Sequence, residues 1–394
     1  MYKCLQVLLI VLTLTTSTAT ANASGPPFAQ TVGFYHWGGR YSTSVSQGVE
    51  QIAGLGGKLA RITLSPRYYT DYNLGGGCYP NFSLSAIVQE PDVKKAFANE
   101  QIDVFMLTAY DGVSFGDCIN PRHLDPAFYT PSNVTAIVKE YSDLTLYLYE
   151  TYRKTHKRFI ISNWESDNEV YCGAAYAYAT DPGARAACDA RYRVSSEGSR
   201  SPEESLAGLT LWYQSRQRGI DEGASRALSH GIGGKRVYFA PEFCNVRTLH
   251  DAGFKSVLYD VLPFVLFDYV SYSSYESINR AELDKALIAD LNIIQGVIGS
   301  SAIILGEVGF ARSAWGPEGT IVRTERVIDA ALSWGVSYIF QWNMYDQDTI
   351  DDFGICDLMG QLTALGKYYV QRLGAANDAI SGRSEMSSRE FRWR

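Results

Sequence analysis

Two glutamates in this sequence follow apolar runs, at points where a strand could end. Glu165 comes directly after "RFIISNW" (residues 158–164), and Glu307 closes "SAIILGE" (residues 301–307). If both runs are strands of one parallel barrel, their carboxyl ends lie on the same face, and the two carboxylates meet across its mouth. This pairing suits glycosidic bond cleavage, because a protonated carboxyl can donate to the leaving oxygen while an ionised one attacks the sugar or activates water. A carboxyl separation of about 5 to 5.5 Å would predict retention of configuration, and a wider one inversion.

A second acidic group competes with Glu165 for the role at the end of the fourth apolar run. Glu169 follows Asn168 within "SDNEV", a little further along the chain. A strand of typical length that begins near Arg158 ends around Asn163, whereas Glu169 would need an unusually long strand. We therefore expect Glu165 to be the acid and base, and Glu169 is the alternative.

The elements that must position these groups follow a repeating pattern of apolar, β-branched runs and segments of helical periodicity. Eight runs fit a strand, at residues 31–36, 57–64, 101–110, 158–164, 236–242, 267–274, 301–307 and 337–343. Several of the helical segments end at glycine, as helices commonly do. The pattern predicts an α/β fold, a (β/α)8 TIM barrel with long βα loops after strands two, three and four that wall a cleft. A doubly wound open sheet is the alternative.

With these two strand ends, the chain resembles clan A of the glycoside hydrolases over about residues 31–373. The resemblance implies a retaining enzyme in which Glu307 is the nucleophile and Glu165 the acid/base. The sequence departs from the usual Asn-Glu ending of the clan's fourth strand, because Trp164 separates Asn163 from Glu165. The clan's Gly-Glu ending of strand seven is matched at Glu307.

The resemblance also implies residues that bind the substrate. Asn163, or Asn168 if Glu169 is the acid, would bond the 2-hydroxyl of the sugar, and Arg61 in "LARITL" would keep the nucleophile ionised. Either Tyr272 or Tyr275 in "YVSYSSYES" would donate to the nucleophile. Trp342 in "IFQWN" would form an apolar platform under the sugar ring.

Two further residues at predicted strand ends are candidates for the site. Trp37 follows the first strand, in "FYHWGGRY", and Glu242 follows the fifth, in "APEF". Trp37 would contact the sugar. Glu242 would bind a sugar hydroxyl or, as the less favoured reading, would itself be the acid.

The N-terminus predicts export. Lys3, the apolar stretch "CLQVLLIVLTL" and the small residues of "ATANAS" form a signal peptide over residues 1–23, so we expect a secreted protein, extracellular or periplasmic. The catalytic domain would comprise residues 24–376, followed by a disordered tail over residues 377–394. Six cysteines remain after the signal, enough for three disulfides in an oxidising compartment. We expect Cys172–Cys188 first and Cys78–Cys118 second, although the sequence does not fix the connectivity.

Composition excludes other function classes. The chain has 35 Lys and Arg against 42 Asp and Glu, a net charge of −7, which argues against a nucleic-acid partner because such binding relies on cations at the phosphates. The region after the signal has no apolar stretch long enough for a membrane helix, and the scattered histidines form no metal motif. The sequence therefore predicts a secreted, cofactor-free retaining glycoside hydrolase that acts on a polysaccharide or oligosaccharide. The alternative is a TIM barrel that binds carbohydrate without cleaving it.

Overall fold

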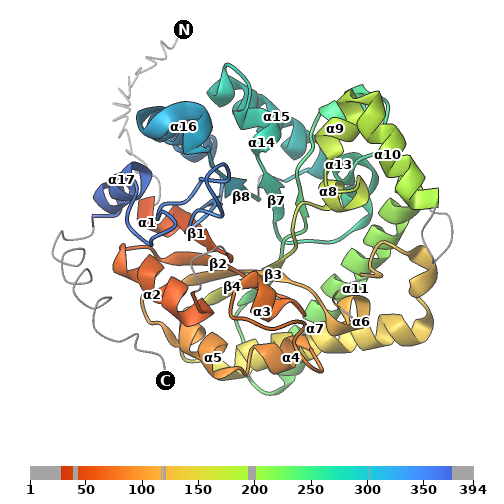
Figure 1. The fold of residues 1–394 in the computed structure, drawn as a ribbon. Helices are drawn as coiled ribbons and strands as arrows, with labels where there is room; N and C mark the ends of the chain where they lie inside the picture. Colours follow the sequence, from red (N-terminus) through yellow and green to blue (C-terminus); the bar gives the residue numbers. More distant parts are fainter. Residues whose placement is uncertain are drawn as a thin grey trace, which may run out of the picture.

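The structure, a computed structural model, describes residues 28–38, 43–116, 118, 121–193, 201–300 and 302–374. The predicted signal peptide over residues 1–23 and the predicted tail over residues 377–394 lie outside the described residues, so both stay predictions. The described part forms one ring of strands surrounded by helices (Figure 1).

All the strands pair in parallel within one sheet, in the order β5-β4-β3-β2-β1-β9-β8-β7-β6. The strands are β1 (Val32–His36), β2 (Leu59–Leu64), β3 (Val104–Ala109), β4 (Arg158–Ser162), β5 (Val237–Phe239), β6 (Glu242–Phe243), β7 (Val270–Ser273), β8 (Ile303–Val308) and β9 (Tyr338–Gln341). Each of the eight predicted strands overlaps at least one of them. The predicted α/β barrel is confirmed.

The predicted strand over residues 236–242 is divided into β5 and β6, because Pro241 has no N–H to donate to a sheet ladder. β5 pairs with β4 on one side, and β6 pairs with β7 on the other. Backbone hydrogen bonds join the two edges: the Phe239 carbonyl accepts from Asp268 N at 3.0 Å, and the Pro241 carbonyl accepts from Ser271 N at 2.9 Å. This closing seam, residues 237–243 against residues 268–273, turns the sheet into a barrel.

Helices and short helical turns follow the strands around the ring (Figure 1). The α-helices are α1 (Phe28–Thr31), α2 (Val45–Gly54), α3 (Tyr68–Asp71), α4 (Leu84–Ile87), α5 (Pro91–Ala98), α6 (Gly112–Phe115), α7 (Pro131–Thr151), α8 (Ser166–Val170), α9 (Ala175–Thr180), α10 (Pro182–Arg193), α11 (Pro202–Ser229), α12 (Thr248–Asp251), α13 (Val257–Asp260), α14 (Tyr275–Ile278), α15 (Leu283–Ile298), α16 (Arg312–Trp334) and α17 (Ala364–Leu373). The 3-10 helices are η1 (Pro126–Phe128) and η2 (Leu262–Phe264).

Local sequence explains where the long helices begin and end. Ser201 caps α11 in a capping box with Glu204, and Pro202 occupies the first helical turn, where its missing N–H costs nothing. At the other end, α15, α16 and α17 stop at glycines whose φ angles are 67°, 100° and 71°, a left-handed conformation that residues with a Cβ rarely adopt. The expectation that helices end at glycine is confirmed for these three.

The barrel interior has an apolar lower part and a polar upper part. The lower part holds Leu59, Val104, Met106, Ile160, Ala240, Ile304, Tyr338 and Phe340. Because side chains alternate along a strand, Arg61 on β2 and Thr108 on β3 also point inward, closer to the strands' carboxyl ends. Apolar residues filling the bottom therefore leave the charged groups gathered at the mouth.

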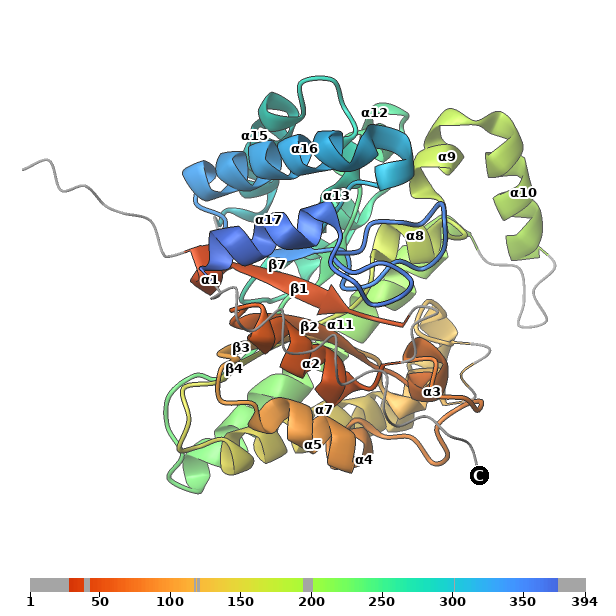
Figure 2. The same ribbon diagram turned by 60° about the vertical axis from the view of Figure 1, so that its left-hand side comes forward.

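The predicted long loops after β2, β3 and β4 contain short helices, α3 to α6 and α8 to α10 among them. In Figure 2 the β1 arrow points toward the side that carries α3 and α8, and α9 and α10 stand out from the body of the barrel above that side. Both predicted disulfides are present in these loops, Cys78–Cys118 with 6.0 Å and Cys172–Cys188 with 5.7 Å between Cα atoms. Cys244 and Cys356 are free, so the possible third disulfide does not form.

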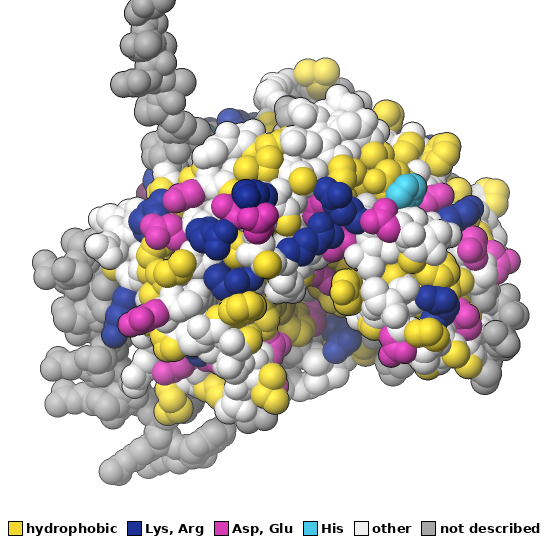
Figure 3. All heavy atoms as spheres, turned by 90° about the horizontal axis from the view of Figure 1, so that it is seen from above, with side chains coloured by type: hydrophobic (Ala, Val, Ile, Leu, Met, Phe, Trp, Pro, Cys, Tyr) yellow, Lys and Arg dark blue, Asp and Glu magenta, His cyan; other side chains and the backbone are white. Residues whose placement is uncertain are grey.

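Acidic and basic side chains are interspersed over the face seen in Figure 3. Within the described residues, no helix is both long enough and apolar enough to cross a bilayer.

Candidate active site

Glu165 lies just beyond the end of β4 and is almost fully buried at the mouth of the barrel. Ser273, at the end of β7, donates a hydrogen bond to Glu165 Oε1, and Asn168, in α8, donates to Oε2. The carboxyl group is therefore held from two sides, by a strand across the mouth and by the helix that follows it.

Glu307 reaches the same mouth because β8 contains a bulge. Leu305 pairs with Tyr272, but Ser273 pairs with Glu307, so Gly306 is an extra residue in the β8 strand. A bulge of this kind turns a side chain that would alternate outward toward the interior. Ser274 holds the bulge with two hydrogen bonds to the Glu307 carbonyl, one from its N–H and one from its hydroxyl, both 3.0 Å long.

The Glu307 carboxyl group keeps one oxygen free of hydrogen bonds. Among the described residues, nothing donates to the buried Oε1 atom, and the nearest cation is Arg61 Nη1 at 3.7 Å. An unpaired buried carboxylate oxygen is costly to desolvate, so it marks a position where a ligand or a reacting atom is accommodated.

Burial dominates the acid–base behaviour of both glutamates. It raises the pKa of Glu165 to about 7, against the opposing hydrogen bonds from Ser273 and Asn168. Burial also raises the pKa of Glu307 well above its ordinary value, and the nearby Glu165 charge raises it further, while Arg61 lowers it. The charge of Glu242 likewise raises the pKa of Glu165, so these neighbouring carboxyl groups disfavour full ionisation near neutral pH.

Arg61 is brought to the site, but its main partner differs from the predicted one. Its guanidinium is fully buried and forms a bidentate ion pair with Glu242, Nη1 to Oε2 at 2.7 Å and Nη2 to Oε1 at 2.9 Å. Glu307 lies further from it, at 3.7 Å. Glu242 is itself completely buried, so its carboxylate is engaged inside the protein rather than exposed to a sugar hydroxyl.

The structure does not bring Asn163 into the site. Its amide NH2 donates to Ser166 Oγ at 2.8 Å and to the Glu242 carbonyl at 3.2 Å, and its amide oxygen accepts from Glu242 N at 3.1 Å. These contacts tie the end of β4 to β6 and leave the buried side chain no group for a sugar. Asn168, by contrast, contacts the Glu165 carboxylate directly.

Glu169 lies within α8, away from the strand end. Its carboxylate accepts hydrogen bonds from Tyr110 at 3.2 Å and from Ser166 at 3.3 Å. It also contacts His123 Nε2 at 3.2 Å. It faces the segment after β3, whereas Glu165 faces Glu307. The two candidates for the acid therefore lie in different surroundings.

The predicted aromatic residues gather at the ends of two adjacent strands, β1 and β9. Trp342 contacts Trp37 with ring centres 5.5 Å apart, and Tyr35 meets Trp342 edge-on at 4.9 Å. Burial raises the pKa of Tyr275, at the start of α14, well above its ordinary value. The nearby charges of Glu307 and Glu165 raise it further. Tyr272 points away from the mouth, stacks on Phe243 and bonds Ser277 at 2.7 Å, so it is not part of the site.

Sequence reasoning missed the serines that hold the carboxylates. Ser271 Oγ donates to Glu242 Oε2 at 2.6 Å, and Ser273 Oγ donates to Glu165. Both come from the β7 stretch "VSYS", whose alternation of small polar and apolar residues was the available signal. The alternation indicated one polar face, which is the face that lines the barrel interior.

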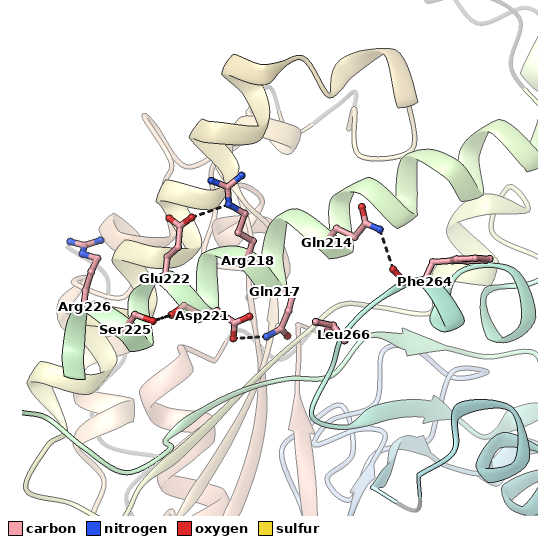
Figure 4. Close-up of a pocket in the computed structure, with 9 residues that line it drawn as sticks. All are labelled: Gln214, Gln217, Arg218, Asp221, Glu222, Ser225, Arg226, Phe264 and Leu266. Carbon is pink, nitrogen blue, oxygen red and sulfur yellow. Dashed lines mark hydrogen bonds and ion pairs between the residues drawn. The ribbon is translucent and has the colours of Figure 1, made fainter. Parts of the chain in front are cut away.

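A groove of about 640 Å³ lies elsewhere, on the outer surface of α11 (Figure 4). Two side-chain hydrogen bonds lie within it, from Arg218 to Glu222 at 2.9 Å and from Gln217 to Asp221 at 2.8 Å. None of the site residues lines it. Among the described residues, no three His, Cys, Asp or Glu side chains are arranged to hold a metal ion.

Comparison with known proteins gives structural matches only. No protein-family model matches the chain, and no curated protein matches it. A GH5_18 protein from Streptomyces cattleya, solved in complex with Manb1-4GlcNAc, has a TM-score of 0.54 and 12% sequence identity, and the match covers 89% of this chain and 80% of that one. The chain shares the fold of a GH5 protein.

Two other glycoside hydrolases give the same result. The exo-beta-1,4-mannosidase Op5Man5 from Opitutaceae bacterium strain TAV5 has a TM-score of 0.53 and 13% identity, with 89% of this chain covered; the match spans 60% of the mannosidase. A GH5-4 broad specificity endoglucanase from Clostridium longisporum has a TM-score of 0.52 and 11% identity, with 88% and 96% of the two chains covered. Because the sequence identities are only 11 to 13%, these matches confirm the clan A resemblance at the level of the fold.

Proposed function

We propose that this protein is a retaining glycoside hydrolase that cleaves O-glycosidic bonds, with Glu307 as nucleophile and Glu165 as acid/base. The observation that supports it most directly is the placement of two buried carboxyl groups at the ends of β4 and β8, where burial raises the pKa of both. The shared barrel fold of the GH5 proteins adds to this support, although fold alone does not determine function.

The reaction assigns each carboxyl group one role per step. In the first step, the Glu307 carboxylate attacks the anomeric carbon while Glu165 gives its proton to the leaving oxygen, and a covalent glycosyl ester forms. In the second, Glu165 takes a proton from water, the resulting hydroxide attacks the same carbon, and the Glu307 carboxylate is released. The free Oε1 of Glu307 and the raised pKa of Glu165 suit these roles.

The substrate is a polysaccharide or oligosaccharide in this proposal, and the protein is secreted. Trp342 and Trp37 offer apolar ring faces, the surface that a sugar's C–H face contacts, and the Tyr35 ring lies between Trp342 and Arg61. Export is supported by the predicted signal peptide and by the disulfides in the βα loops.

The first test measures hydrolysis of aryl glycosides and of a panel of plant, fungal and bacterial polysaccharides. Glu307→Gln should lower kcat by several orders of magnitude, because it removes the attacking group. Glu169→Gln is the matched control, since it neutralises a glutamate of the neighbouring helix and should keep most of the activity. Equal turnover by the wild type and Glu307→Gln would contradict the proposal.

A second comparison assigns the acid/base. Glu165→Gln should lose far more activity on a glycoside with a poor leaving group than on a dinitrophenyl glycoside, whose departure needs little protonation. If no glycoside is hydrolysed but glycans still bind, the protein is the non-catalytic barrel and the hydrolase proposal is wrong.

A further inference from the structure

Glu242 is a third carboxylate below the two proposed catalytic glutamates, and the proposed reaction does not use it. It lies on β6, at the closing seam of the barrel, and no part of it is exposed. Its two oxygens both face Arg61, at 2.7 and 2.9 Å, and Ser271 donates to Oε2 at 2.6 Å. A bidentate pair of this length is among the stronger polar contacts in proteins.

The guanidinium of Arg61 is immobilised by its remaining contacts. Its Nε donates to Thr108 Oγ1 at 3.0 Å, Nη1 donates to the Gly306 carbonyl at 2.9 Å, and Nη2 donates to the Asn163 carbonyl at 3.1 Å. The Tyr35 ring covers its face at 4.2 Å. Arg61 is therefore held against Glu242 and is not free to move toward Glu307.

Glu242 also contacts the two chain segments that carry the proposed catalytic glutamates. Its Oε1 accepts from Glu165 N at 3.4 Å, and a Cβ placed on Gly306 would lie 2.0 Å from its Oε2. Gly306 thus has no room for a side chain because Glu242 and Ser271 occupy that space. The ion pair and the β8 bulge that aims Glu307 are packed as one unit.

More acidic than basic groups surround this unit. Arg61 supplies the positive charge of the ion pair, and Arg216 donates a hydrogen bond to the Asn163 side chain at 3.4 Å. The titratable groups of the described residues that act on the pair and on Glu307 are Tyr35, Glu165, Glu242, Tyr275 and Asp351. A cation that is already neutralised stabilises a further carboxylate much less than a bare one.

We propose, resting on the glycosidase function above, that Glu242 is a positioning residue that takes up the charge of Arg61 and withholds that charge from Glu307. Arg61 lies 3.7 Å from Glu307 but is already paired with Glu242, so Glu307 ionises at a higher pH than it would beside an unpaired arginine, and the ion pair sets the acid side of the enzyme's pH range. Glu242 touches neither substrate nor reacting atoms in this proposal and acts through Arg61.

The test measures the ionisation of Glu307 directly. Protein labelled with carboxyl-carbon-13 glutamate is titrated by NMR, and the Glu307 signal is assigned by its loss in Glu307→Gln. In Glu242→Gln a negative charge disappears and Arg61 becomes unpaired, so the Glu307 midpoint should fall by about 1 to 3 pH units. The acid limb of kcat/KM should move by the same amount.

The double variant Arg61→Gln/Glu242→Gln keeps the proposal falsifiable if the single variant does not fold. The pair is neutral as a whole, so its joint removal should leave the Glu307 midpoint near the wild-type value. If Arg61 instead serves Glu307 directly, the double variant should raise that midpoint, and the proposal is wrong. An unchanged midpoint in a folded Glu242→Gln would also overturn it.

Asp290→Asn is the matched control, because it removes the buried partner of Arg247 away from the site and should leave the Glu307 titration unchanged. The NMR readout needs no substrate. Failure of the hydrolase proposal, seen as absent turnover in the wild type, is therefore distinguishable from failure of this one.

Discussion

Burial of the Glu165 carboxyl group at the mouth lowers the free energy of unfolding at higher pH. Its pKa is raised by burial from 4.5 to about 7. Below pH 4.5 it is protonated in both folded and unfolded states. Between pH 4.5 and 7 only the unfolded chain releases the proton, so the free energy of unfolding falls as the pH rises, and it levels off above pH 7.

Glu165→Gln should consequently stabilise the protein in a pH-dependent way. The gain relative to the wild type should be larger at pH 8 than at pH 4 by on the order of 3 kcal/mol, since one pKa unit corresponds to about 1.4 kcal/mol. Urea unfolding of both proteins at pH 4, 6 and 8 measures it, and the pH 4 pair is the internal control. An equal difference at all three values would contradict the expectation.

At this scale the sequence indicated which residue types meet but not how they pair. Glu165, Glu307, Arg61 and Trp342 do lie together at the mouth. Glu165 and Trp342 follow strands, Glu307 lies near the end of β8, and Arg61 points inward from the middle of β2. The partner of Arg61 was not predictable, because Glu242 lies across the barrel and 181 positions away along the chain. The outward direction of Tyr272 was readable from strand alternation, but only once the strand's register was known.

The β8 bulge is the element that decides the aim of Glu307. Period-two alternation would send Gly306 inward and Glu307 outward, and the extra residue lets both face the interior. No sequence pattern specified it, because a bulge depends on the register with the neighbouring strand. The division of the fifth strand was more accessible, since Pro241 stands within the predicted run, one residue before its end.

Gly306→Ala should therefore damage the site through β8. The new Cβ would meet Glu242 Oε2 at 2.0 Å and Ser271 Oγ at 2.2 Å, so the variant should lose about 3 kcal/mol of stability and most of its activity. Gly319→Ala in α16 is the control, because its nearest neighbour is Trp315 Cβ at 3.5 Å, and it should be neutral or slightly stabilising. Thermal unfolding and aryl-glycoside turnover report the two effects.

The Cys172–Cys188 disulfide closes the protruding segment that carries α9 and α10, and the two cysteines have a sequence separation of 16. Replacing both cysteines by alanine should cost up to about 3 kcal/mol, as expected for a loop of this length. We expect faster proteolytic cleavage within residues 171–193 than in the wild type, measured by mass spectrometry. Unchanged cleavage would show that helix packing alone orders the segment.

At the scale of the whole molecule, the barrel needs no residue outside the described range to complete its sheet. β1 begins at Val32, and α17 ends at Leu373. We therefore propose residues 24–376 as the catalytic domain. A chain shortened to these residues should unfold at the same temperature as the exported protein and hydrolyse the same substrates, and N-terminal sequencing of the exported protein should find its first residue near position 24. A lower unfolding temperature of the shortened chain would mean that some of the removed residues contribute to the stable fold.

The whole fold was predictable because eight strand patterns and their helices recur, and a repeated local signal tolerates errors at single boundaries. The helices α3, α4, α6, α8 and α9 within the long βα loops were not predicted, because runs of four to six residues carry too little periodicity.

The closing seam between β5, β6 and β7 gives the barrel a preferred place to open. It is joined by few backbone hydrogen bonds around Pro241, and the Arg61–Glu242 pair spans the interior from β2 to this edge. Amide hydrogens of residues 237–243 should accordingly exchange with deuterated water sooner than those of β2 and β3, whose ladder is continuous over six residue pairs. The cross-barrel ion pair then restrains that opening, so the part of the barrel expected to open first lies directly beneath the two carboxyl groups.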